Sequence, residues 1–233
     1  MKNAILMAAG MGTRMRPLTE TMPKPLVPVA GIPMIETVIG ALQTAGVDRI
    51  YIVSGYLGEK LVYLGKKYNN ISIIHNEDYK TINNISSIYA AKEVLKAGDC
   101  YICEADLYIN NPAFLQQEPT KSGYFGKYVE GHSEDWVFER DINGYITRVG
   151  KKGDDCYNMV GIAFFKEQEA KKLAREKNIA ILSSLHDLNQ ALAFGDKFFF
   201  LKNGVVTYAG GREIITPEVI RDIFDIDVKI TEI

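Results

Sequence analysis

The apolar positions of the chain fall into short runs that alternate with longer segments of helical period. The first apolar run covers residues 4–8 and ends in a glycine-containing loop, and Pro33 can occupy the first turn of a helix running to about residue 45. Further strands are expected at Arg49–Ser54, Ile71–His75 and 100–104, and further helices over 58–68 and from Asn84 or Ser86 to near Gly98. This alternation predicts an α/β fold with a mostly parallel, Rossmann-like sheet and helices on both faces. Ligands of such folds lie at the carboxyl ends of the strands.

A different pattern begins near Gly123. Short strands are expected over 124–128, 136–140 and 145–149, and Asn143-Gly144 is a strong hairpin turn. An unbroken apolar strand of core type follows over 159–165. We therefore expect a small antiparallel hairpin patch over the binding edge of the sheet.

The loop after the first strand has the composition of a phosphate-binding loop. Small residues and glycines keep side chains out of the way, so that backbone N–H groups can approach an anion closely. Arg14, Arg16 and Lys24 add fixed positive charge to the same short segment. The loop lacks the G-K-[ST] ending of the P-loop and the third glycine of the dinucleotide fingerprint. The residues that form it are Ala8, Ala9, Gly10, Met11, Gly12 and Thr13.

Composition narrows the classes of protein that this chain can represent. Its 233 residues are 47% hydrophobic and 24% charged, which suits a globular protein with a substantial core. The net charge of −2 gives no electrostatic case for binding nucleic acid or an anionic membrane. No apolar run reaches the length of a membrane span and no signal-peptide pattern is present, so a cytoplasmic location is expected. Cys100, Cys103 and Cys156 are expected to be buried and reduced, because the C-x-x-C pair falls on opposite faces of a strand.

Two acidic residues close the fourth predicted strand. Glu104 and Asp106 are spaced by two, so they point to the same face of an extended chain at its carboxyl end. Carboxylates in this position can hold Mg²⁺ against phosphate oxygens, whereas the alternative is a pair of solvated acids. We therefore expect Mg²⁺ as the cofactor at this strand end.

Two other segments carry side chains with two possible uses. Asn83, Asn84 and Ser87 follow the third strand, where they suit either the hydrogen-bonding edge of a base or the cap of a helix. Trp136, the only tryptophan, follows Asp135 on the predicted hairpin patch. An aromatic face beside a carboxylate suits a quaternary ammonium, but a tryptophan can equally anchor a hairpin to the core.

The motifs in this order resemble a known family. The pattern A-A-G-x-G-x-R-x-x-P-L-T, with P-K-P-L downstream, is similar to the nucleotidyltransferases that join a nucleoside triphosphate to a phosphorylated small molecule. Up to about residue 165 the order of motifs most resembles the bacterial CTP:phosphocholine cytidylyltransferases. The resemblance implies transfer of CMP from CTP to phosphocholine or a related amine or polyol phosphate, with release of pyrophosphate. The opening motif alone would serve an NTP:sugar-1-phosphate nucleotidyltransferase equally well.

The resemblance also implies roles for individual residues. Our hypothesis gives Arg14 and the loop amides to the β- and γ-phosphates, Lys24 to the α-phosphate and acceptor, and Asp106 to the metal. The family carries similar segments near the nucleotide at Gly55-Tyr56 and around Asn83, Asn84 and Ser87. Glu104 is a mild departure, because the family usually has Asp there, and we expect it near the nucleotide. Trp136 and Asp135 are expected to contact the acceptor.

The chain beyond about residue 172 resembles a different family. Residues 177–224 are similar to the closing segment of an ABC-transporter ATPase subunit, in which His186 falls on the switch histidine. The sequence contains no Walker A loop upstream, so a structural role is favoured over an ATPase role. We expect a strand over 179–184, a helix capped near Asp187, a hairpin at Asn203-Gly204 and a final helix from Pro217.

The two resemblances together predict two domains. One is a nucleotidyltransferase domain over 1–170, and the other is an α/β tail over 171–233 packed on it, as in a natural fusion or a chimera. The tail replaces the segment that in the cytidylyltransferases brings a second carboxylate to the metal. A nucleotide-binding protein without turnover is therefore an alternative to the enzyme, and an ATPase fragment is a more remote one.

Overall fold

The computed structural model describes residues 1–81, 85–175, 198–202 and 205–224. The chain forms two compact units, Met1–Ile179 and Ala180–Ile233. The predicted tail boundary near residue 171 falls within helix α5 (Glu167–Arg175), which belongs to the first unit.

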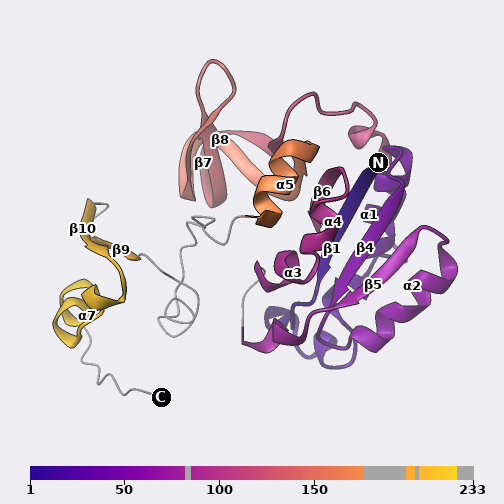
Figure 1. The fold of residues 1–233 in the computed structure, drawn as a ribbon, viewed down its shortest axis with the longest axis horizontal. Helices are drawn as coiled ribbons and strands as arrows, with labels where there is room; N and C mark the ends of the chain where they lie inside the picture. The colour runs from indigo at the N-terminus through magenta and orange to yellow at the C-terminus, as the bar shows by residue number, and fades with distance from the viewer. Residues whose placement is uncertain (82–84, 176–197, 203–204, 225–233) are drawn as a thin grey trace. The chain divides into compact units, whose positions relative to one another are not determined.

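A six-stranded sheet organises the first unit (Figure 1). Four strands are parallel, and two antiparallel strands extend the sheet at one edge. The parallel strands are covered on both faces, so they are formed by the mainly apolar runs of the sequence. On β1, for example, Ile5 and Leu6 are completely buried on opposite faces. The strand order is β5-β4-β1-β6-β8-β7, with bounds β1 Lys2–Ala8, β4 Arg49–Ser54, β5 Ile71–His75, β6 Asp99–Glu104, β7 Gly123–Arg140 and β8 Ile146–Phe165.

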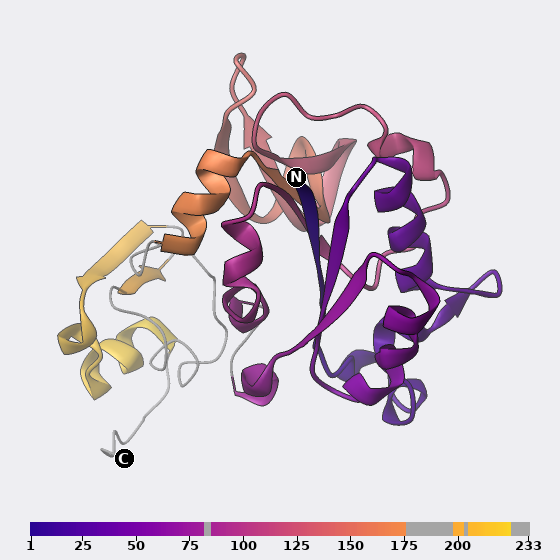
Figure 2. The same ribbon diagram turned by 45° about the vertical axis from the view of Figure 1, so that its right-hand side comes forward.

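Helices cover both faces of this sheet, as the sequence predicts. Figure 2 shows α1 (Met34–Thr44) and α2 (Val62–Lys67) on one side, with α3 (Ile85–Ala90), α4 (Lys92–Leu95) and α5 on the other. The short elements that complete the unit are the strands β2 Pro28–Val29 and β3 Ile32–Pro33 and the 3₁₀ helices η1 Thr13–Met15, η2 Leu18–Glu20, η3 Lys24–Leu26, η4 Gly58–Leu61, η5 Glu77–Lys80 and η6 Pro112–Leu115. The predicted fold class is confirmed.

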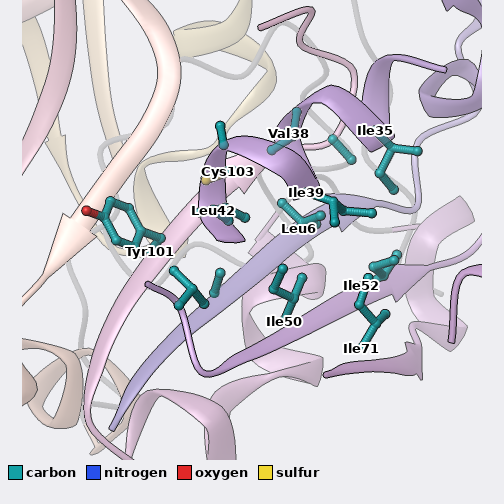
Figure 3. Packing of buried hydrophobic residues seen from close by; sticks show 14 of the residues in the cluster. Leu6, Ile35, Val38, Ile39, Leu42, Ile50, Ile52, Ile71, Tyr101 and Cys103 are labelled. Atoms are coloured by element: carbon teal, nitrogen blue, oxygen red, sulfur yellow. The ribbon is translucent and has the colours of Figure 1, made fainter. Parts of the chain in front are cut away.

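The larger core lies between the sheet and α1 (Figure 3). Ile35, Ile39 and Leu42 recur at helical spacing along α1 and are fully buried against the strands. Tyr101 extends the same core along β6, where its ring lies 4.7 Å from that of Phe164 on β8. The core therefore fixes β1 and β6 side by side.

Some predicted elements differ in detail from the observed ones. The helix expected to run to Gly98 is interrupted at Ala91, whose ψ of 15° departs from helical geometry, so that α3 and α4 are separate. The segment 58–68 begins as the 3₁₀ helix η4 before it becomes α2. The predicted strands 124–128 and 136–140 are parts of one irregular strand, β7, and 145–149 and 159–165 lie in or at the end of β8. The three cysteines are buried and free, as expected.

The second unit contains a hairpin and a helix. Strands β9 (Phe198–Lys202) and β10 (Val205–Gly210) pair antiparallel, and α7 (Pro217–Phe224) places the fully buried Ile220 in a small apolar cluster. The predicted strand pair and final helix are confirmed, whereas the predicted strand over 179–184 and the helix near Asp187 lie outside the described residues. Within the described ranges, no helix has the length and apolar character needed to cross a membrane.

Candidate active site

The candidate site lies where the strand order reverses. β4 and β5 follow β1 on one side of the sheet, whereas β6 pairs with β1 on the other. The loops after β1 and β6 therefore diverge at neighbouring carboxyl ends, which is where open α/β sheets bind ligands. The backbone N–H of Ala105 donates to the carbonyl of Met7 at 3.3 Å, which keeps the two strand ends together.

Gly12 shapes the loop after β1. Its φ of +60° and ψ of 30° are left-handed, and a Cβ there would lie 3.0 Å from Thr19 Cγ2 and 3.1 Å from Lys24 Cβ. Thr19 Oγ1 donates to the Gly12 carbonyl at 2.8 Å, so the chain folds back across the loop. The missing side chain at Gly12 thereby allows Lys24 to approach the loop from η3.

The exposed part of the loop is available to a ligand. Gly10, Met11, Thr13 and Arg14 are exposed, whereas Ala8 and Ala9 are buried at its base. A loop that binds an anion requires exposed backbone amides and a cationic side chain, and this loop offers both beyond its buried first residues.

The loop after β4 packs directly against this base. The N–H of Tyr56 donates to the carbonyl of Ala9 at 3.1 Å. A Cβ on Gly55 would lie 2.8 Å from the Cβ of Ala9 and 2.7 Å from Cγ of Tyr79, so only glycine fits between them. Gly55 and Tyr56 thus lie beside the loop after β1, and their contact with a nucleotide stays a prediction.

Lys24 and Asp106 form an ion pair at the centre of the site. Their side chains are 31% and 22% exposed, so the pair is accessible from solvent at the mouth of the site. Burial raises the pKa of neighbouring Glu104, and the charge of Asp106 raises it further, while Lys24 and Arg14 oppose this shift. The structure therefore brings Lys24, Glu104 and Asp106 together, with Arg14 within electrostatic reach of Glu104.

The donor set of this site suits a hard cation. Asp106 offers carboxylate oxygens beside the loop after β1, and Mg²⁺ typically takes one or two carboxylates together with substrate phosphates. Across the described part of the chain, no group of three or more His, Cys, Asp and Glu side chains gathers around a common point. The Asp106 carboxylate fits a Mg²⁺ ion that substrate phosphates also hold.

The segment predicted to contact the base is described only in part. Asn83 and Asn84 lie outside the described residues. Ser87 is 3% exposed in α3, and its Oγ accepts a hydrogen bond of 3.2 Å from the side-chain amide of Asn76. Ser87 therefore has a structural partner, and its contact with a nucleotide stays a prediction.

Trp136 and Asp135 lie on β7 within a small polar network. Trp136 is 39% exposed, and the ammonium of Lys151 lies 5.8 Å from its ring centre. The side-chain amide of Asn158 donates to Asp135 at 3.0 Å, and Ser133 Oγ donates to Asn158 at 2.6 Å. The network holds the Asp135 carboxylate through Asn158, and the contact of Asp135 and Trp136 with an acceptor stays a prediction.

Several residues that shape the site were not selected from the sequence. Thr19 was visible as the last letter of the R-x-x-P-L-T motif, but its contact with Gly12 depends on the fold. Gly161 is a glycine inside an apolar strand, which signals a close approach of another group. Tyr79 and Tyr124 carry no local signal, because their positions depend on neighbouring strands.

Comparison with known proteins identifies the family. A family model described as the MobA-like NTP transferase domain matches residues 4–121. The chain belongs to this family. The match includes the glycine loop, Lys24 and Asp106, which are the features that the geometry brings together.

Curated relatives of this NTP transferase include several cytidylyltransferases. The chain is 52% identical over 185 residues to the 2-aminoethylphosphonate cytidylyltransferase of Lancefieldella rimae, covering 79% of this chain and 75% of the relative. It is 41% identical over 172 residues to the choline-phosphate cytidylyltransferase of Streptococcus pneumoniae, covering 73% and 72%. The solved structure of CTP:phosphocholine cytidylyltransferase from Streptococcus pneumoniae superimposes with a TM-score of 0.66 at 34% identity, covering 74% of each chain. The chain is a nucleotidyltransferase of the cytidylyltransferase family, whereas the likeness of its tail to a transporter ATPase stays a prediction.

Proposed function

We propose that this chain transfers CMP from CTP to a small amine-bearing phosphonate or phosphate and releases pyrophosphate. The observation that carries the proposal is the Lys24–Asp106 ion pair beside the glycine loop, where β1 and β6 diverge. A cation for phosphate, a carboxylate and exposed loop amides then lie within one site. These groups suit the transfer of a nucleotidyl group, which needs alignment and neutralisation of charge more than covalent catalysis.

The reaction assigns a task to each group. An oxygen of the acceptor's phosphonate or phosphate attacks the α-phosphorus of CTP, and the bond from this phosphorus to the pyrophosphate oxygen breaks in line. Arg14 and the loop amides hold the β- and γ-phosphates, where negative charge accumulates on the leaving group. Lys24 neutralises the α-phosphate and the acceptor oxyanions. Mg²⁺, when bound at Asp106, supplies further neutralisation of phosphate charge.

The acceptor is best taken from the amine-bearing class. The relative named for 2-aminoethylphosphonate is 52% identical, while the pneumococcal relative named for choline phosphate is 41% identical. We therefore favour 2-aminoethylphosphonate, and phosphocholine is the second candidate because Trp136 and Asp135 offer an aromatic face beside a carboxylate. Sugar 1-phosphates are the remaining alternative from the opening motif.

Pyrophosphate release tests the proposal. The full chain is incubated with Mg²⁺, each nucleoside triphosphate in turn, and a panel of 2-aminoethylphosphonate, phosphoethanolamine, phosphocholine and sugar 1-phosphates. Release with CTP and an amine-bearing acceptor is expected. CTP binding by calorimetry with no release for any pair would instead show a nucleotide-binding protein without turnover.

Two variants test the central ion pair. Lys24→Ala and Asp106→Ala should each lower kcat/KM by about a hundredfold or more, because each removes a charge that stabilises the transition state. Retained secondary structure by circular dichroism serves as the folding control. Turnover within a few fold of the parent in both variants would contradict the assignment.

A further inference from the structure

A polar cluster lies beside the phosphate loop on the side away from Gly55. It consists of the Glu104 carboxylate at the end of β6, the backbone of Gly161 on β8, and the phenol of Tyr124 on β7. β8 lies between β6 and β7 in the sheet, so the cluster spans three adjacent strands. The hypotheses drawn from the sequence give no role to Tyr124 or Gly161.

Gly161 brings β8 close to the carboxylate. Its φ is +75°, and a Cβ there would lie 3.0 Å from Glu104 Oε2. Any other residue at this position would press on Glu104 and would also strain the backbone. The absence of a side chain leaves the carboxylate room beside the strand.

Tyr124 closes the cluster from the edge strand. Burial raises the pKa of Tyr124 to about 12, and the negative charge of Glu104 adds to this shift. The backbone of Gly161 hydrogen-bonds the same phenol and acts in the opposite direction. Tyr124 therefore stays a neutral hydroxyl within electrostatic reach of Glu104, and its oxygen can accept a further hydrogen bond.

Tyr124 of this cluster also lines an aromatic cavity. The cavity has a volume of about 560 Å³ and is lined in part by Tyr124, Phe138 and Tyr157. The rings of Tyr124 and Phe138 lie 6.3 Å apart in an edge-on arrangement, and Phe138 stacks on Tyr157 at 5.3 Å. Aromatic faces attract primary and quaternary ammonium groups alike, so any selection between the two depends on the oxygens of Glu104 and Tyr124.

We propose that Glu104 and Tyr124 bind the primary ammonium of the acceptor and thereby select amines that carry N–H bonds over quaternary ammonium acceptors. This inference rests on the proposed function and adds the specificity-determining residues to it. The ammonium donates hydrogen bonds to the Glu104 carboxylate and to the Tyr124 oxygen. A trimethylammonium group has no N–H to donate, and its methyl groups would keep it farther from both oxygens.

The position of Glu104 fits an acceptor with a short linker. Glu104 lies two residues before Asp106, and Asp106 pairs with Lys24, to which the acceptor oxyanions are assigned. A molecule that reaches Lys24 and Glu104 together must hold its anionic and cationic groups close to one another. An aminoethyl phosphonate or phosphate meets this condition.

The same geometry separates the cluster from the proposed nucleotide segments. Gly55 and Tyr79 lie beside Ala9 on the β4 side of β1, whereas Tyr124 and Gly161 lie on the β6 side. Glu104 faces this second group. The proposed acceptor site therefore lies on the β6 side of the phosphate loop, whereas Gly55 and Tyr56 lie on its β4 side.

Paired acceptors provide the test. Initial rates with CTP are measured for 2-aminoethylphosphonate and for its N,N,N-trimethyl analogue, in the parent, Glu104→Gln, Tyr124→Phe and the control Glu93→Gln. Glu104→Gln should lower kcat/KM for the primary amine by about 10- to 100-fold, the usual effect of losing a charged hydrogen-bond partner. For the trimethyl analogue, kcat/KM of this variant should stay within about threefold of the parent value. Tyr124→Phe should act in the same direction by about 3- to 10-fold. Glu93 is an exposed partner of Lys96 on α4, so its variant should match the parent for both acceptors.

Calorimetry with CTP separates the possible failures. The dissociation constant for CTP should stay within about threefold of the parent in both variants. An active parent whose selectivity does not change in Glu104→Gln or Tyr124→Phe would overturn this inference and leave the proposed function intact. Equal losses for both acceptors together with weaker CTP binding would assign Glu104 to the nucleotide and also overturn it. A parent that releases no pyrophosphate with any acceptor would overturn the proposed function and this inference together.

Discussion

At Gly12 the backbone takes a left-handed conformation while two side chains press on the place where a Cβ would be. Thr19 and Lys24 occupy that space, and Lys24 continues from it to Asp106. The conformation of one residue thus determines where the positive charge of the site lies. Gly10, in the same loop, has open space around its Cα and no positive φ.

This difference makes a prediction for single substitutions. Gly12→Ala should destabilise the fold by about 1 to 2 kcal/mol, because a left-handed conformation is costly for any residue with a Cβ and the new methyl group contacts Thr19. It should also lower kcat/KM by displacing Lys24. Urea unfolding of the parent, Gly12→Ala and Gly10→Ala measures the stability effect, and Gly10→Ala should change the unfolding free energy by only about 0.5 kcal/mol. Equal effects of the two substitutions on stability would contradict the role given to Gly12.

At the scale of elements, Glu36 joins α1 to α2. Its carboxylate accepts hydrogen bonds from the Tyr63 hydroxyl at 3.0 Å and the Tyr68 hydroxyl at 2.8 Å, and it pairs with Lys67. Burial acts to raise the pKa of Glu36, but the hydrogen bonds from Lys67, Tyr68 and Tyr63 outweigh burial and lower it. The ionised carboxylate therefore stabilises the packing of the two helices on the sheet.

Glu36→Gln should lower the unfolding free energy at pH 7 by about 1 to 2 kcal/mol, because hydrogen bonds to a charged acceptor are lost in a partly solvated setting. The pKa of Glu36 in the folded protein lies below its ordinary value of 4.5, so its contribution is full above that value and is lost as the pH falls through the lower, folded pKa. Urea titrations at neutral and acidic pH should show the parent approaching the variant at low pH. If the unfolding free energies of the parent and Glu36→Gln differed by the same amount at every pH, the charge of Glu36 would not contribute to stability.

The break between α3 and α4 shows why element boundaries are harder to predict than elements. The apolar spacing of the segment indicates a helix, and two helices are present. Ala91 is a good helix former, yet it is 1% exposed in the core beneath the sheet. Its departure from helical geometry is a product of that packing rather than of local preference.

At the scale of the whole molecule, the described groups of the candidate site belong to the first unit. The phosphate loop, the Lys24–Asp106 pair and the Glu104 cluster all lie within Met1–Ile179. The described part of the second unit has its own small cluster around Ile215 and Ile220. The described part of the candidate site therefore depends on contacts within the first unit.

A chain ending at residue 179 should bind CTP with a dissociation constant within about threefold of the full chain. Calorimetry with CTP and Mg²⁺ measures this, with circular dichroism to verify folding. Pyrophosphate release by the shortened chain then reports whether residues 180–233 take part in turnover. A folded shortened chain without affinity for CTP would place part of the nucleotide site in the second unit.

The amino-acid sequence by itself determined the alternation of strands and helices, the glycine loop with its arginine and lysine, and the two acidic residues at and just after the end of β6. Each of these depends on local properties: hydrophobic period, the freedom of glycine, and the charge of side chains near one another in the chain. Only the tertiary structure decided that Lys24 pairs with Asp106, that Gly161 lies against Glu104, and that Tyr124 comes within electrostatic reach of Glu104. These contacts join strands and loops far apart in the sequence, and the order of strands in the sheet, set by packing of the whole core, is what brings them together.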